Sequence, residues 1–194
     1  MEESKNKKYK KQELNKVITF PVVFGLKEIN KDIIIDTYIS SGDSKKAIIE
    51  KAINFHQKGN LLQAEKYYQY CIDQSFNDPR IFSNYGIILK NLGKLKEAEL
   101  YLLKAIELKP DFADAYYNLG NTLRDRGKLT QAVLALRKAI QIKPDSANAL
   151  LNLGNILSNL GKLKEAELYQ RKAIELKPDF ADAYYNLGNT LRDR

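Results

Sequence analysis

Residues 91–126 read NLGKLKEAELYLLKAIELKPDFADAYYNLGNTLRDR, and residues 159–194 repeat this stretch with two differences. Gln170 and Arg171 stand where Leu102 and Leu103 stand in the first copy. The copies are offset by 68 residues, and the segment between them, 127–158, carries a more diverged version at half that spacing. The period is therefore 34 residues. A fixed period of this size is typical of a solenoid, in which each unit stacks on its neighbours to bury its apolar face.

The 34-residue frame runs without a gap from Lys45 to the end of the sequence. It gives complete units at 45–78, 79–112, 113–146 and 147–180, and a half unit at 181–194. If the positions of each unit are numbered 1 to 34, small residues occupy positions 8, 20 and 27, and large apolar residues occupy positions 11, 17 and 28. Spacings of three, four and seven predict two amphipathic helices per unit, with small residues facing large ones.

Glycine and proline divide each unit at fixed places. Glycine at position 15 predicts the end of the first helix, and proline at position 32 predicts the end of the second. The glycines are Gly59, Gly93, Gly127 and Gly161, and the prolines are Pro110, Pro144 and Pro178. Position 24, which is usually apolar, carries Gln170 in the fourth unit, and we expect Tyr169 beside it to cover the gap.

Residues 1–44 differ in kind from the repeats. The first part is rich in lysine, lacks apolar periodicity and is predicted to be disordered. The stretches 17–20 and 33–35 are β-branched or aromatic and predict short strands. We interpret 1–44 as a basic arm that either packs along the first repeat or orders only on a partner.

Composition sets loose limits on function. The net charge of +8 is mild and spread along the chain, so solvated surface charge pairs explain it as well as acidic partners do. A single cysteine excludes a disulfide within the chain. The apolar run 17–26 is far shorter than the roughly 20 residues that span a bilayer. These features favour a cytoplasmic protein without a membrane span.

The pattern resembles that of the tetratricopeptide repeat (TPR) family. The third unit matches the family at Tyr116, Leu119, Gly120, Ala132 and Pro144, although leucine replaces the family's aromatic residue at positions 11 and 24. The resemblance implies an all-α fold, a right-handed α-solenoid of helix-turn-helix repeats. The sequence PDFADAYYNLGN, at 110–121 and 178–189, is similar to repeat sequences in the superhelical arrays of O-GlcNAc transferases and of bacterial multi-repeat proteins.

In such arrays, the resemblance implies, ligands bind a concave face lined by the first helices. Asparagine recurs there at positions 6 and 9, and an amide that both donates and accepts hydrogen bonds can hold an extended peptide backbone. The predicted groove residues are Asn84, Asn118, Asn121, Asn152, Asn155, Asn186 and Asn189, with Tyr117, Tyr185, Lys90, Arg124 and Arg192. An equally weighted alternative is that asparagine is simply common at these repeat positions and that its side chain is solvated.

We find no pattern that indicates catalysis. The single histidine, His56, is interpreted as a surface residue, and Cys71 occupies a slot that alanine fills in the other units. The sequence has neither a cysteine and histidine cluster with metal spacing nor a glycine-rich phosphate loop. We therefore expect no catalytic residue, no metal and no cofactor.

The leading hypothesis is a protein-interaction scaffold that binds an extended peptide in its groove. One alternative is the targeting array of a glycosyl- or sulfo-transferase whose catalytic domain lies outside this chain. RNA binding is a minor alternative, and we do not expect nucleic acid as the partner. The half unit 181–194 leaves Tyr184, Leu187 and Leu191 without the second helix they are patterned to meet. This open face predicts a truncated chain or a homodimer contact.

Overall fold

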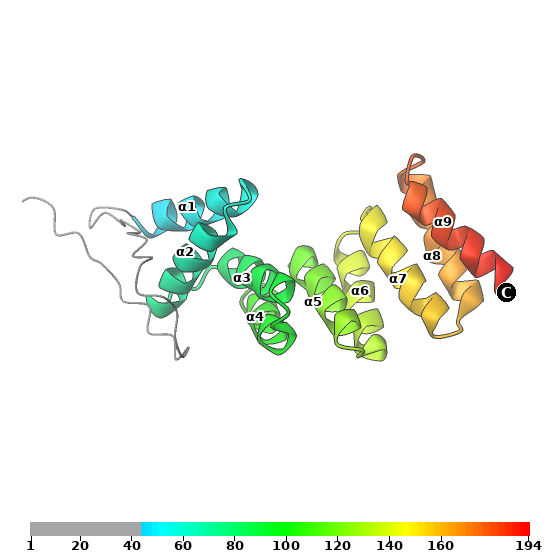
Figure 1. Ribbon diagram of the computed structural model, residues 1–194, viewed down its shortest axis with the longest axis horizontal. Coiled ribbons are helices and arrows are strands. Elements are labelled where there is room, and N and C mark those ends of the chain that lie inside the picture. The colour runs from blue at the N-terminus through cyan, green and yellow to red at the C-terminus, as the bar shows by residue number, and fades with distance from the viewer. Residues whose placement is uncertain (1–43) are drawn as a thin grey trace, which may run out of the picture. The chain divides into compact units, whose positions relative to one another are not determined.

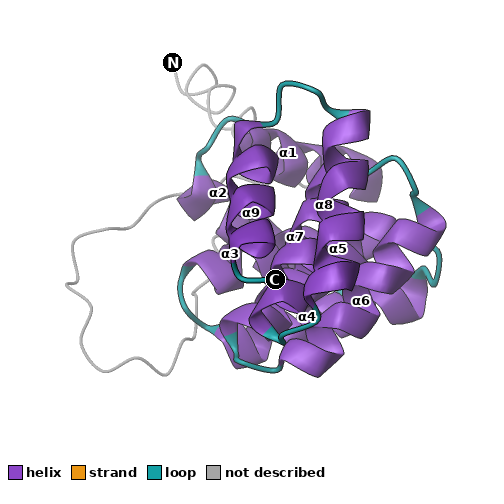
Figure 2. Ribbon diagram, turned by 90° about the vertical axis from the view of Figure 1, so that its right-hand side faces the viewer, coloured by secondary structure: helices purple, strands orange, loops and turns teal. Residues whose placement is uncertain are grey.

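The computed structural model describes residues 44–194, and all of its regular structure in that range is helical (Figures 1 and 2). The helices are α1 (Lys45–Gln57), α2 (Leu61–Asp73), α3 (Pro79–Asn91), α4 (Leu95–Leu108), α5 (Ala113–Asp125), α6 (Leu129–Ile142), α7 (Ala147–Asn159), α8 (Leu163–Leu176) and α9 (Ala181–Arg192). First helices begin every 34 residues, which confirms the predicted all-α repeat. The predicted arm and its strands at 17–20 and 33–35 lie outside the described residues, so the division into arm and array stays a prediction.

The chain divides into two compact units, Met1–Tyr67 and Tyr68–Arg194. In the described part of the first unit, Ser44 caps α1, because its hydroxyl accepts a hydrogen bond from the Ala47 N–H (3.2 Å). The ring centroids of Phe55 and Tyr67 lie 5.3 Å apart and join α1 to the middle of α2. An aromatic pair thus takes part in closing this first helical pair.

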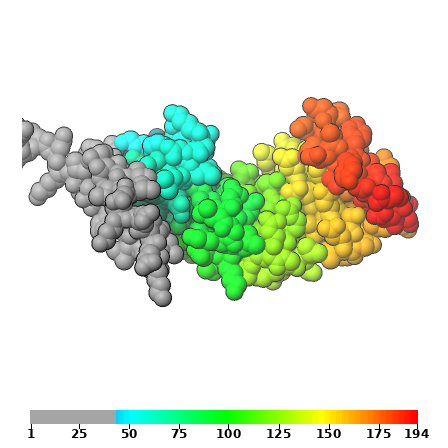
Figure 3. All heavy atoms as spheres, viewed as in Figure 1, coloured from blue at the N-terminus to red at the C-terminus, as the bar shows by residue number. Residues whose placement is uncertain are grey.

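In the second unit, helices pack in consecutive pairs, α3 on α4, α5 on α6 and α7 on α8, and each pair then packs on the next. Among the first helices, α3 contacts α5, α5 contacts α7 and α7 contacts α9, whereas between residues 79 and 194 no such contact joins α4, α6 and α8. The row of first helices is therefore the tighter side of the stack and lines its concave face. Figure 3 shows the surface colours from green to red following chain order, as expected when each pair touches only its neighbours.

Within the pairs α3–α4, α5–α6 and α7–α8, glycine at position 8 allows the two helices to approach closely. A Cβ atom added to Gly120 would lie 2.6 Å from Leu136 Cγ, and one added to Gly86 would lie 2.9 Å from Leu102 Cγ. Both leucines are fully buried. A methyl group therefore does not fit where position 24 fills the space. The small residue at position 8 faces a large one, as expected, but the large residue is at position 24 rather than at position 11, 17 or 28.

The turn inside each unit is built on the glycine at position 15. Gly127 has φ +74°, which only glycine adopts without strain. The Gly127 and Lys128 N–H groups donate to the carbonyls of Arg124 and Leu123, at 2.9 Å each, and so close the helix end. At the end of the second helix, Lys143 has left the helical region, with φ −128° and ψ 88°, ahead of Pro144. Both predicted breaks are confirmed.

Ion pairs connect successive repeats at equivalent positions of the two near-identical copies. Glu99 on α4 pairs with Arg126 and, at 3.1 Å, with Lys128, both beyond the end of α5. Glu167 on α8 pairs in the same way with Arg194, which follows α9. Glu99 and Arg126 are mostly buried, so this pair contributes more than a fully exposed one would.

The half unit at the end of the chain exposes apolar side chains. Tyr184 and Leu191 are 52% and 43% exposed, whereas Leu123, the α5 counterpart of Leu191, is 5% exposed. Helix α6 packs on α5, and within the described residues no second helix follows α9. The predicted self-association through this face stays a prediction.

The expectation that Tyr169 covers a gap beside Gln170 is wrong. Tyr169 does not cover a gap at position 24, because the Gln170 side chain itself fills the slot and is 0% exposed. Its Nε2 donates to Asn155 Oδ1 at 3.2 Å, but within the described residues its buried Oε1 has no hydrogen-bond partner. A buried acceptor without a partner destabilises the fold by about 1–3 kcal/mol.

We therefore expect Gln170→Leu to raise the free energy of unfolding by about 1–2 kcal/mol, because it removes this acceptor and restores the residue found at Leu102. The half-buried Asn155 can bond water instead. The matched change, Leu102→Gln, should lower the free energy of unfolding by about 2–3 kcal/mol, because it places a polar side chain in an apolar slot. Urea unfolding followed by circular dichroism measures both, and a destabilised Gln170→Leu protein would contradict the account.

The two copies also provide a matched pair of glycines. Gly120→Ala should destabilise the protein by about 1–3 kcal/mol, because the new methyl collides with Leu136. Gly188 occupies the same position in α9, but a Cβ there meets nothing within 4 Å. Gly188→Ala should therefore stabilise the protein by up to about 1 kcal/mol through helix propensity alone. Equal effects in thermal melts of the two variants would rule out the close-approach explanation.

Candidate functional site

Three predicted groove residues form one hydrogen-bonded group that joins two repeats. Asn152 on α7 donates from Nδ2 to Asn121 Oδ1 at 2.8 Å and to the Tyr117 hydroxyl at 3.3 Å, both on α5. Asn121 is only 7% exposed, and Tyr117 and Asn152 are half-buried. The amide of one repeat is thus held by the repeat before it, on the concave row of first helices.

The other predicted asparagines do not continue this arrangement. The Asn84 amide donates to the Tyr68 hydroxyl on α2 at 3.0 Å, and Asn155 accepts from Gln170. Asn186 donates to the carbonyl of Asp182 in its own helix at 2.8 Å. These three amides are engaged within the protein, so a uniform ladder is not formed.

Two predicted residues keep their amides available. The side chains of Asn118 and Asn189 are half-buried on α5 and α9, and neither makes a hydrogen bond within the described residues. Asn118 lies three residues before Asn121 on α5, so the two side chains share one face of the helix. The row therefore combines fixed and available amides.

The predicted cations contribute little net charge to this face. Arg124 pairs with its neighbour Asp125 at 2.9 Å, and Arg192 pairs with Asp193 at 3.1 Å. Lys90 is half-buried on α3, and Tyr185 on α9 is 72% exposed. Because the arginines are neutralised locally, the face is not a cationic strip.

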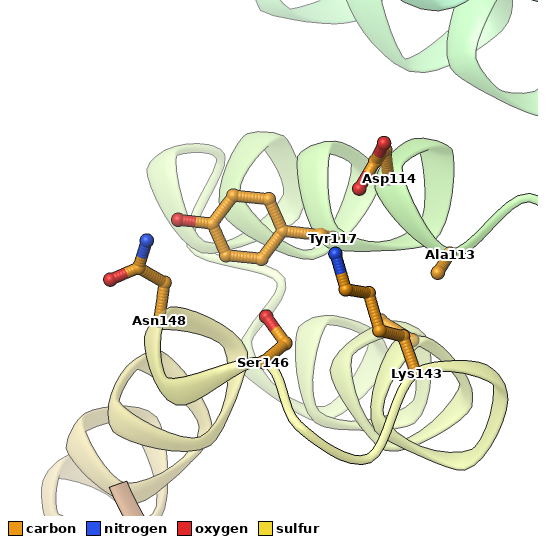
Figure 4. A pocket seen from close by; sticks show the side chains of 7 residues that line it. Ala113, Asp114, Tyr117, Lys143, Ser146 and Asn148 are labelled. Atoms are coloured by element: carbon orange, nitrogen blue, oxygen red, sulfur yellow. The ribbon is translucent and has the colours of Figure 1, made fainter. Parts of the chain in front are cut away.

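A pocket of about 200 Å³ opens beside Tyr117, between α5, the end of α6 and the start of α7 (Figure 4). We call it the Ser146 pocket; it is lined by Ala113, Asp114, Tyr117, Ala139, Lys143, Ser146 and Asn148. Tyr117 belongs both to the pocket wall and to the group with Asn121 and Asn152. The hydrogen bond from Asn152 thus fixes one wall of the pocket.

The pocket arises from one departure from the repeat. Position 34 is phenylalanine in two units, where a lysine at position 31 lies over the ring: Lys109 is 5.4 Å from the Phe112 centroid, and Lys177 is 4.8 Å from that of Phe180. In the third unit position 34 is Ser146, so Lys143 has no ring to cover. The missing ring leaves space and leaves the lysine without its usual contact.

Lys143, Ser146 and Asn148 were not among the predicted site residues. A signal was present, since serine replaces phenylalanine at position 34 while lysine is kept at position 31. Its meaning depends on the lysine lying over the ring, which a repeat pattern does not reveal. The sequence therefore indicated the face but missed this pocket.

Neither candidate for chemistry lies in this pocket. Burial raises the pKa of the Cys71 thiol to about 12, which keeps the thiol protonated at neutral pH. Burial also lowers the pKa of His56, which is half-buried on α1. Within residues 44–194, no group of three or more His, Cys, Asp and Glu side chains could hold a metal ion. None of the described helices is long and apolar enough to cross a membrane.

Comparison with known structures supports the fold. MamA, from residue 41 to its end, from Desulfovibrio magneticus RS-1 is 25% identical, with a TM-score of 0.69 over 78% of this chain and 86% of that chain. YrrB, described as a TPR protein with an unusual peptide-binding site, is 24% identical, with a TM-score of 0.67 over 77% of each chain. The Cut9–Hcn1 hetero-tetramer of the APC/C is 20% identical, with a TM-score of 0.71 over 76% of this chain and 30% of that one.

No curated protein matches the sequence. Family models, in contrast, cover the second unit from residue 79 onward. A model described as "TPR repeat" matches 120–161, and two described as "Tetratricopeptide repeat" match 79–112 with 147–180 and 101–133 with 169–194. Together with the helix pairs described above, these matches show that the chain belongs to the tetratricopeptide repeat family.

Proposed function

We propose that this chain is a protein-interaction scaffold that holds an extended peptide of its partner along α3, α5, α7 and α9. The observation that carries the proposal is the row of contacting first helices, which presents the available amide of Asn118 beside the fixed pair Asn121 and Asn152. Family membership supports a binding role, and the YrrB structure is described by its peptide-binding site.

The spacing of the repeats suits an extended chain. Packed helices lie about 8–10 Å apart, so first helices in mutual contact place equivalent residues at roughly this interval. Three residues of extended peptide span about 10 Å at ~3.3 Å each. One amide per repeat can thus meet every third residue of the peptide backbone, and asparagine supplies the donor and the acceptor that a peptide group needs.

Backbone contacts alone give weak binding. At about 1 kcal/mol net per hydrogen bond, the amides of Asn118 and Asn189 provide about 2–4 kcal/mol between them, which corresponds to millimolar affinity or weaker. Pockets for peptide side chains must therefore add affinity and select the sequence. The Ser146 pocket is one candidate, because Tyr117, a predicted groove residue, forms part of its wall.

An alternative function is that of a substrate-targeting array of a glycosyl- or sulfo-transferase, which would use this same face. The sequence at 110–121 supports this alternative through its similarity to such arrays. RNA binding receives no support from the charges. The phosphate backbone of RNA requires available cations, whereas Arg124 and Arg192 are paired with aspartates.

The test begins with peptides selected from a random 12-residue phage-displayed library on the full chain. We expect Asn118→Ala to weaken binding of the selected synthetic peptides at least fivefold, because it removes about 1 kcal/mol of hydrogen bonding. Fluorescence anisotropy with labelled peptides measures the affinity, and circular dichroism confirms unchanged helicity.

The matched control is Gln131→Ala, which removes an exposed amide from the second helix α6. It should leave affinity within about twofold, since one lost hydrogen bond corresponds to about fivefold. If Asn118→Ala behaves like this control, or if the library yields no binding peptide, the proposed face is wrong. Asn152→Ala is a poorer test, because it also releases Tyr117 and Asn121.

A further inference from the structure

We infer that the Ser146 pocket binds a primary carboxamide, the side chain of an asparagine or glutamine in the bound peptide. The source of the carboxamide rests on the proposed function, whereas the chemistry of the pocket does not. The inference depends on two charged groups that face the pocket without being paired to each other, Lys143 and Asp114.

Lys143 is exposed at the end of α6, and its ammonium makes no ion pair within the described residues. Asp114, in the first turn of α5, likewise makes none. Figure 4 shows the Lys143 amino group directed toward α5 near Tyr117, with Asp114 on the same helix and Asn148 on the other side of the pocket, and all four residues line it. The pocket therefore presents a strong hydrogen-bond donor and a strong acceptor to the same space.

A primary carboxamide matches this pair of groups. Its oxygen can accept from the Lys143 ammonium while its NH₂ donates to the Asp114 carboxylate. A ligand carboxylate would be repelled by Asp114, and a ligand ammonium would be repelled by Lys143. The amide of Asn148 remains available for a further hydrogen bond, and the Tyr117 ring gives an apolar wall for the methylene groups.

The presence of Lys143 and of Ser146 can each be explained by the helix that it terminates or caps, but these local roles do not account for the pocket. Lys143 lies at the C-terminus of α6, where the helix dipole favours a cation. The Ser146 hydroxyl caps α7 by accepting a hydrogen bond from the Ala149 N–H at 3.4 Å. Lys109 and Lys177 occupy the same place at the other junctions, yet there the lysine lies over a phenylalanine ring. A different N-cap would satisfy the helix without opening this space to Lys143 and Asp114.

The chain itself supplies the variant that closes the pocket. Ser146→Phe introduces the residue that positions 112 and 180 already carry, so we expect the variant to keep its helicity and its fold. The new ring should fill the pocket and lie under Lys143. Random 12-residue libraries are selected in parallel on the wild-type chain and on this variant.

We expect wild-type selections to be enriched at least fivefold in asparagine and glutamine at one peptide position, and the Ser146→Phe selections to yield peptides without that enrichment. Peptides that bind without any carboxamide preference, or a preference that survives Ser146→Phe, would overturn the pocket and leave the scaffold standing. Enrichment of aspartate and glutamate on the wild type would also overturn the proposed carboxamide preference, because Asp114 would then not repel acidic side chains.

A second variant tests the role of Asp114 directly. Asp114→Asn keeps the size of the side chain but removes the negative charge that excludes acids, so its selections should shift from carboxamides toward aspartate and glutamate. An unchanged carboxamide preference would contradict the pairing of donor and acceptor.

Small probes separate failure of the pocket from failure of the scaffold. Acetamide is titrated into the full chain and into Ser146→Phe, with acetate as the control probe, and the backbone amide signals of Ala139 and Ser146 are followed by NMR. Saturable shifts with acetamide on the wild type alone support the pocket even if no peptide is selected. Equal shifts with acetate, or none with acetamide, overturn it.

Discussion

The close approach of glycine at position 8 to the large side chain at position 24 is the contact on which this fold depends. Gly86, Gly120 and Gly154 each face a side chain that a Cβ atom would meet at 2.6–2.9 Å. This contact sets the distance between the two helices of a pair. The distance in turn decides which faces remain for the next pair, so the same local packing repeats along the second unit.

Function in such an array arises where the repeat departs from its own rule. Packing positions that recur between the repeats build the stack, and the first helices then present one concave row. The features that distinguish one part of the row from another come from single residues. Ser146 in place of phenylalanine opens a pocket, and the link from Asn152 to Asn121 forms at one junction only among the described residues.

The sequence predicted the regular part of the fold because its causes are local. The glycine at position 15, the proline at position 32 and the apolar spacing act within one or two helical turns, and the helix bounds follow them. The family resemblance then indicated the row of first helices. Residues 1–43 lie outside what the structure describes, so the interpretation of the arm stays a prediction.

What the sequence missed depends on the fit between neighbouring helices. Whether Asn152 rests in water or bonds to Tyr117 is decided by the offset of α7 on α5, which no pattern within one repeat contains. Gln170 was expected to need cover from Tyr169, but it is itself buried in the leucine slot. The Ser146 pocket required knowing that lysine lies over the ring in the other units.

A crystal structure of the full chain with a selected peptide tests the central claim most directly. The account predicts an extended peptide along α3, α5 and α7, with its backbone within hydrogen-bond distance of the Asn118 amide. A peptide bound to the second helices α4, α6 and α8, or only to the exposed face of α9, would contradict it. Such a result would show that the concave row of first helices is not the binding surface.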